Sequence, residues 1–174
     1  MKKQIFTILI LITLGCTVNA QDATKLNWYT VNEALELQKK EQRKILMDVY
    51  TDWCGWCKRM DASTFSNPKV IEYLNKHYYC VKFNAEGKEN VTFNEVNFTN
   101  DGQYGRSHSF AVAVLQGKMT YPSIAYFDEK SQLITALAGY MTPEQILPIL
   151  VYFGEDHYKT KDFQTFSAEY SKKM

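Results

Sequence analysis

The apolar positions of the chain fall into short continuous runs, typical of buried strands, separated by segments with helical spacing. The expected strands are residues 28–29 at an edge, 44–50, 79–84, 123–128 and 133–138. A small hairpin is expected over residues 91–98, where apolar and polar side chains alternate. The expected helices are residues 31–40, a helix opening at Pro68, residues 107–115, a helix from Pro143 to about Phe153, and a final helix carrying Phe163, Phe166 and Tyr170.

Capping signals support these helix starts. Thr30 and Glu33 form a capping box, and Asn67-Pro68 combines a cap with proline at the first helical position. Strands alternate with helices, and two adjacent strands precede the helix at Pro143. This order predicts an α/β domain with a mixed sheet.

The first twenty residues resemble a targeting segment rather than part of the fold. Lys2 and Lys3 precede an apolar run of about eleven residues, too short for a transmembrane helix of roughly twenty. Val18-Asn19-Ala20 predicts cleavage before Gln21, which leaves one domain over residues 21–174. Lipid attachment at Cys16 is the alternative, although Thr13 stands where such motifs have Leu, and a retained anchor is the third option.

Composition narrows the function classes. The chain has 174 residues, of which 45% are hydrophobic, so a globular domain with a full core is expected. Twenty basic side chains balance nineteen acidic ones without long charge runs, which argues against nucleic acid or an anionic membrane as partner. After cleavage the cysteines are Cys54, Cys57 and Cys80, and this odd count favours chemistry over a disulfide framework.

The pair Cys54 and Cys57 stands where a strand is expected to pass into a helix. The free amide groups of a helix N-terminus stabilise a thiolate, so we expect Cys54 to be the nucleophile. Cys57 lies one turn further on and is expected to resolve a mixed disulfide. Trp53 should pack beside the pair and leave the Cys54 sulfur open.

A buried carboxylate would help Cys57 to lose its proton. Asp48 is the one carboxylate in an apolar strand, six residues before Cys54, and Lys82 in the neighbouring strand could pair with it. The alternative is that both side chains point to solvent at strand ends.

Together these residues carry a resemblance to the thioredoxin superfamily. Its order of motifs is found in Asp48, Trp53-Cys54-Gly55-Trp56-Cys57-Lys58, Lys82, Tyr121-Pro122 and Gly139. The stretch 53–70 looks most like exported thioredoxin-like proteins and the thioredoxin-like domain of membrane electron-transfer reductases. The resemblance implies a core over about residues 44–153, with a mixed four- to five-stranded sheet flanked by helices.

The same resemblance implies a cis peptide before Pro122 that faces the cysteines and offers backbone groups to an extended substrate. An ordinary trans proline that opens the strand is the alternative. Trp53, Gly55, Trp56, Tyr121 and Pro122 are then the expected substrate-binding residues.

Three features depart from the family pattern. Trp56 replaces the proline that cytosolic thioredoxins have between the cysteines, so their redox potential does not carry over. The connection from Asn84 to Pro122 contains an inserted hairpin region at about 86–106, and residues 155–174 form a C-terminal helical extension.

Two rival interpretations remain open. Cys54, Cys57, His77 and Cys80 form a Cys₃His set with zinc-like spacing, although Cys80 falls within an apolar strand. A thioredoxin-fold binding module without redox turnover is the second rival.

The preferred hypothesis is an exported, periplasmic or otherwise extracytoplasmic thiol–disulfide oxidoreductase. It would act on protein disulfides as a reductase or isomerase-like enzyme, with no cofactor beyond the Cys54–Cys57 disulfide. Its expected partners are protein substrates and an electron donor in the membrane or outside the cytoplasm.

Overall fold

The computed structural model describes residues 24–172 and contains a five-stranded mixed sheet. The strands are β1 (Trp28–Tyr29), β2 (Lys44–Tyr50), β3 (Tyr78–Asn84), β6 (Ser123–Phe127) and β7 (Leu133–Ala138). Their spatial order is β1-β3-β2-β6-β7; β2 is parallel to β3 and antiparallel to β6. The predicted mixed sheet is confirmed, with β1 at one edge.

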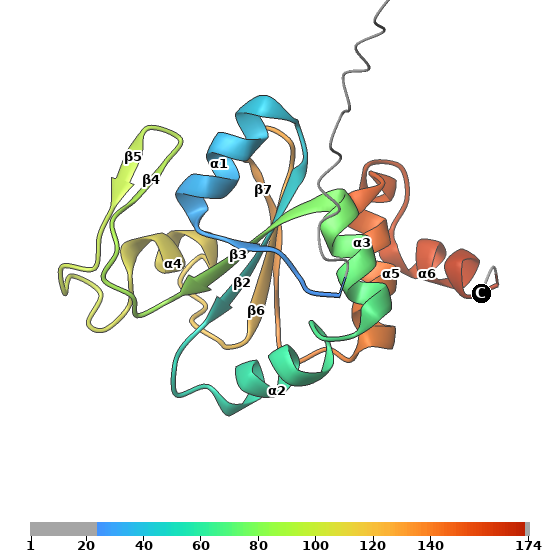
Figure 1. Cartoon of the computed structure of the whole chain (residues 1–174), viewed down its shortest axis with the longest axis horizontal. Coiled ribbons are helices and arrows are strands. Elements are labelled where there is room, and N and C mark those ends of the chain that lie inside the picture. The colour runs from blue at the N-terminus through green and yellow to red at the C-terminus, as the bar shows by residue number, and fades with distance from the viewer. Residues whose placement is uncertain (1–23, 173–174) are drawn as a thin grey trace, which may run out of the picture.

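Helices cover both faces of this sheet (Figure 1). On one face lie α1 (Val31–Lys40) and α4 (Ser109–Val114), and on the other α3 (Pro68–His77) and α5 (Pro143–Gly154). Side chains alternate along β2, so that Ile45, Met47 and Val49 join the core under α1 and α4. Leu46 joins the second core, against α3 and α5, together with Met60 of α2 (Gly55–Ser63). Asp48 follows Leu46 on this second face by strand alternation.

Local signals determine where the helices begin. The Thr30–Glu33 capping box is formed in both directions at the start of α1. Asn67 caps α3 with its side chain, and Pro68 occupies the first turn, where a missing N–H costs nothing. The boundaries differ slightly from the predicted ones, since β3 begins at Tyr78 and α4 covers only Ser109–Val114.

The two predicted additions to the core are separate structural units. The insertion contains a hairpin of β4 (Val91–Phe93) and β5 (Val96–Phe98), which forms its own two-stranded sheet. The C-terminal extension contains the 3-10 helix η1 (His157–Lys159) and α6 (Phe163–Ser171). Phe166 of α6 is buried in the second core and contacts Tyr152 of α5, so this aromatic stripe serves packing.

The predicted leader, including the cleavage site after Ala20 and the alternative lipid site Cys16, lies outside the described residues. Over residues 24–172, no helix has both the length and the apolar character needed to span a membrane.

Candidate active site

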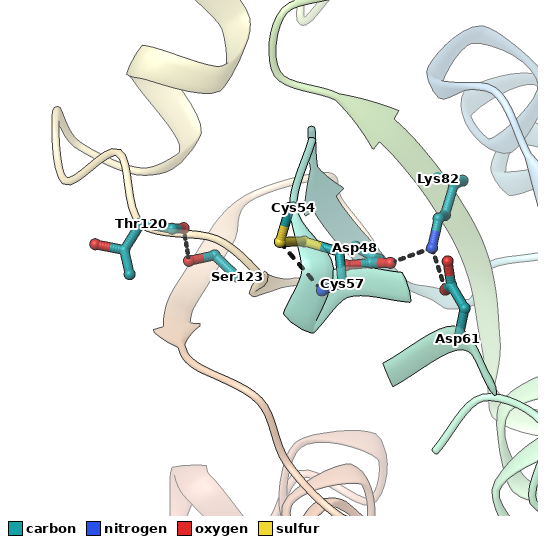
Figure 2. The surroundings of a disulfide bond; sticks show 7 residues. All are labelled: Asp48, Cys54, Cys57, Asp61, Lys82, Thr120 and Ser123. Atoms are coloured by element: carbon teal, nitrogen blue, oxygen red, sulfur yellow. Dashed lines mark hydrogen bonds and ion pairs between the residues drawn. A yellow bond between two sulfur atoms is a disulfide. The ribbon is translucent and has the colours of Figure 1, made fainter. Parts of the chain in front are cut away.

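Cys54 and Cys57 stand at the turn that links β2 to α2, and they form a disulfide (Figure 2). Cys54 is the N-cap residue of α2, and the backbone N–H of Cys57 donates a hydrogen bond to its Sγ at 3.1 Å. The two residues are only 5% and 2% exposed. In the reduced protein the same amide would stabilise a thiolate on Cys54, which is the geometry expected of a nucleophile at a helix N-terminus.

Behind the disulfide lies Asp48, whose side chain is about 1% exposed. Lys82 donates to Asp48 Oδ2 at 2.6 Å, and the parallel register places these two residues directly opposite each other in β2 and β3. Asp48 Oδ1 has no hydrogen-bond partner among the described residues. The alternative in which Asp48 points to solvent is therefore wrong.

A second carboxylate shares the same lysine. Asp61, one turn after Cys57 on α2, forms an ion pair with Lys82 on the side away from Asp48 (Figure 2). The Lys82 ammonium also lies 5.0 Å from the ring centres of both Trp28 and Tyr50. A cation held between two acids and aromatic faces has its charge well stabilised.

The pKa values follow from this arrangement. Burial raises the pKa of Asp48 from 3.8 to about 6, since the charge of Lys82 offsets only part of the desolvation. Burial also disfavours the charged form of Lys82, but the two carboxylates outweigh it and raise the lysine pKa. Asp48 is thus a buried carboxyl that titrates near neutral pH, as a proton acceptor for a thiol requires.

Exposed aromatic rings flank the disulfide. Trp53 is 59% exposed and stands edge-on to Tyr121, with ring centres 5.9 Å apart. Trp56 is 56% exposed and lies 5.4 Å from Tyr140, with the Arg59 guanidinium over both of these rings. These rings offer apolar contact area around a sulfur that is itself nearly buried.

The segment before β6 lies beside the disulfide on the side opposite Asp48 and Lys82 (Figure 2). Its Tyr121–Pro122 peptide is cis, so the trans alternative is wrong. Ser123 donates its hydroxyl to the Thr120 carbonyl at 2.7 Å, which fixes the turn. Gly55 is the first residue of α2, and a side chain there would meet open space, so no close approach requires this glycine.

The structure does not assemble the zinc alternative. Cys80 is buried in β3 within the second core, and burial raises the pKa of its thiol well above the ordinary value. His77 ends α3, where its ring stacks on Tyr73 at 4.3 Å. Within residues 24–172, no group of three or more His, Cys, Asp or Glu side chains could hold a metal ion.

Sequence reasoning missed three residues around the site. Asp61 could have been found, because it lies four positions after Cys57 and therefore on the same helix face. Glu86, which accepts a hydrogen bond from the Trp53 indole, carries no local signal, since it is 33 residues away in the chain. Tyr140, beside Trp56, follows the predicted Gly139 but was not identified.

Two relatives match parts of this chain. Thiol:disulfide interchange protein DsbD of Escherichia coli K12 is 35% identical over 64 residues, which are 34% of this chain and 11% of that protein. Mouse spermatogenesis-associated protein 20 is 26% identical over 109 residues, or 62% of this chain and 14% of that protein. The chain therefore spans only a small part of the length of these relatives.

Among solved structures, a thioredoxin-fold protein from Helicobacter pylori superposes with a TM-score of 0.60 at 16% identity, covering 84% of this chain and 87% of that one. That likeness concerns the fold. The family model of thioredoxin-like domains matches residues 31–154, which include the whole sheet from β2 to β7 and both cysteines. The chain belongs to the family of thioredoxin-like domains.

Proposed function

We propose that this protein is a thiol–disulfide oxidoreductase that acts on protein disulfides. The observation that carries the proposal is the Cys54–Cys57 disulfide at the N-terminus of α2, with the titratable carboxyl of Asp48 buried behind it. The printed name of the DsbD relative, a thiol:disulfide interchange protein, supports the same chemistry.

The reaction starts from the reduced pair. The Cys54 thiolate attacks one sulfur of a substrate disulfide, which breaks the substrate S–S bond and releases one substrate thiolate. A mixed disulfide between Cys54 and the substrate remains. The Cys57 amide, 3.1 Å from Cys54 Sγ in the oxidised state, stabilises the attacking thiolate before the reaction.

Resolution needs a second thiolate. Cys57 transfers its proton toward Asp48 and attacks Cys54 Sγ, which forms the internal disulfide and releases the second substrate thiolate. The unpartnered Asp48 Oδ1 is free to accept that proton, while Oδ2 stays bonded to Lys82. Two electrons pass from the cysteine pair to the substrate, and both substrate thiolates end as thiols.

Net reduction or isomerisation is the proposed direction, with a dithiol electron donor in the membrane or outside the cytoplasm restoring the pair. The leader-like residues 1–20 support an extracytoplasmic location, and lipid attachment at Cys16 is the alternative. The N-terminal residue and mass of the protein recovered from its native host distinguish cleavage before Gln21 from lipidation.

Insulin reduction by the purified protein, with dithiothreitol as electron source, tests the activity. Cys54→Ser should abolish it, and Cys57→Ser should accumulate a mixed disulfide with insulin. Full turnover by both variants would overturn the mechanism. A glutathione redox titration tests the direction: a potential below about −200 mV supports reduction, whereas a value near −120 mV would mark an oxidant.

A further inference from the structure

The inserted region between β3 and α4 is firmly attached next to the cysteine pair. The side-chain amide of Asn100 donates to the carbonyls of Glu86, Gly87 and Arg106, at 2.9–3.2 Å, and so joins the two ends of the insertion. The buried ring of His108 bonds to the Glu89 carbonyl at 2.7 Å. These bonds close the base of the insertion independently of the β4–β5 hairpin at its tip.

The start of this insertion is bonded to the loop that carries Trp53. Tyr50 and Asn84 are paired at the ends of β2 and β3. The Asn84 side chain donates to Asp52 at 3.1 Å and accepts from the Glu86 backbone at 2.9 Å. Consequently Glu86 lies where its side chain reaches across to Trp53.

The carboxylate of Glu86 bonds to two groups at once. Glu86 Oε2 accepts from the Trp53 indole N–H at 3.1 Å and from Arg106 at 2.7 Å. Its side chain is 20% exposed, whereas that of Arg106 is 75% exposed. The arginine therefore orients the carboxylate from the solvent side, and the carboxylate orients the indole.

Trp53 has little else to hold it. Its ring is mostly exposed and touches Tyr121, the residue before Pro122, at its edge. A large exposed ring that is already fixed offers apolar contact to an incoming chain with little loss of side-chain freedom. Because Cys54 is nearly buried, a protein substrate that reaches its sulfur must pack over such neighbouring rings.

We propose that Glu86 is a positioning residue that holds Trp53 in place as a docking surface for protein substrates, so that the insertion selects protein disulfides over small ones. This inference rests on the proposed disulfide exchange activity and names the recognition element of the same site. Small aromatic disulfides need only reach the sulfur and gain little from the fixed indole.

The experiment compares insulin with 5,5′-dithiobis(2-nitrobenzoic acid) as substrates for Glu86→Ala. We expect the insulin KM to rise on the order of fivefold with kcat unchanged, and the rate with the small disulfide to stay the same. Glu86→Gln keeps an oxygen acceptor for the indole and should restore the insulin KM to within about twofold. The indole N–H signal of Trp53 in a ¹⁵N spectrum should shift in Glu86→Ala only.

Glu89→Ala is the matched control. It removes a glutamate from the same insertion, and among the described residues this side chain has no hydrogen-bond or ion-pair partner. Trp53→Ala should raise the insulin KM as Glu86→Ala does. The double variant should be no worse than Trp53→Ala alone, because Glu86 acts through Trp53.

An unchanged insulin KM in Glu86→Ala, an equal loss with both substrates, or additive effects in the double variant would each overturn the inference. Its failure is separable from that of the function. A wild-type protein that reduces neither substrate contradicts the proposed activity and the inference with it. A wild-type protein that reduces both, together with a neutral Glu86→Ala, contradicts the inference alone.

Discussion

Replacing Asp48 by asparagine should make the oxidised protein more stable at neutral pH. Burial raises the pKa of Asp48 from 3.8 to about 6 despite the ion pair with Lys82. One pKa unit corresponds to about 1.4 kcal/mol, so ionising this carboxyl in the folded protein costs roughly 3 kcal/mol relative to the unfolded chain. Asparagine has nearly the same shape and carries no charge, so it avoids this cost.

The sign of the pH dependence follows from the raised pKa. Below about pH 3.8 the carboxyl is protonated in both states, and Asp48 contributes no penalty. Between there and about pH 6 the unfolded chain loses its proton while the folded protein keeps it, so the wild-type free energy of unfolding falls as pH rises. Above pH 6 the full penalty is present.

Urea denaturation of wild type and Asp48→Asn, with the disulfide intact, measures this directly. From about pH 3.5 to pH 7.5 the free energy of unfolding of the variant should gain about 3 kcal/mol on that of the wild type, since most other titrations cancel in the difference. Asp52→Asn, an exposed carboxylate in the neighbouring loop, is the control and should keep a constant difference. A constant difference for Asp48→Asn as well would refute the buried, titrating carboxyl and with it the proton acceptor.

Three further outcomes are expected. Asp61→Asn removes a charge that raises the pKa of Asp48 and leaves Lys82 to a single carboxylate, so the pH profile of mixed-disulfide resolution should move to lower pH; stability should change by less than about 1 kcal/mol, because Asp61 is partly exposed. Cys80 should resist iodoacetamide at pH 8 in the folded, reduced protein and react only in denaturant, as mass spectrometry can follow, because burial raises its thiol pKa. The buried Tyr126 hydroxyl has no hydrogen-bond partner among the described residues, so Tyr126→Phe should be neutral or stabilising by about 1 kcal/mol in urea denaturation; a loss above about 1 kcal/mol would reveal a missing partner.

The elements of the fold were predictable because their signals are local. The capping boxes of α1 and α5 and the proline at the start of α3 stand in the sequence where the helices begin. The pairing of Asp48 with Lys82 could also be predicted, because two buried parallel strands of equal length bring their polar positions into register. Strand alternation then puts Asp48 on the face that α2 covers.

Contacts made by the loops could not be predicted in the same way. The Trp53–Glu86 bond depends on how the chain turns after β3, and no periodicity describes that turn. The zinc-like spacing of Cys54, Cys57, His77 and Cys80 misleads for the opposite reason. Spacing within each pair is local, whereas the orientation of Cys80 into the core depends on the whole sheet.

The site divides into two parts that the fold keeps on different sides of the disulfide. Asp48, Lys82 and Asp61 lie behind it and concern the proton that Cys57 must lose. Trp53 and Glu86 belong to the loops at the ends of β2 and β3 and concern the approach of a substrate. No hydrogen bond or ion pair joins these two groups within residues 24–172, so changes in the first should alter the pH profile without altering substrate preference, and changes in the second should do the reverse. The adjoining ends of two parallel strands thus allow proton transfer and recognition to be adjusted independently around one cysteine pair.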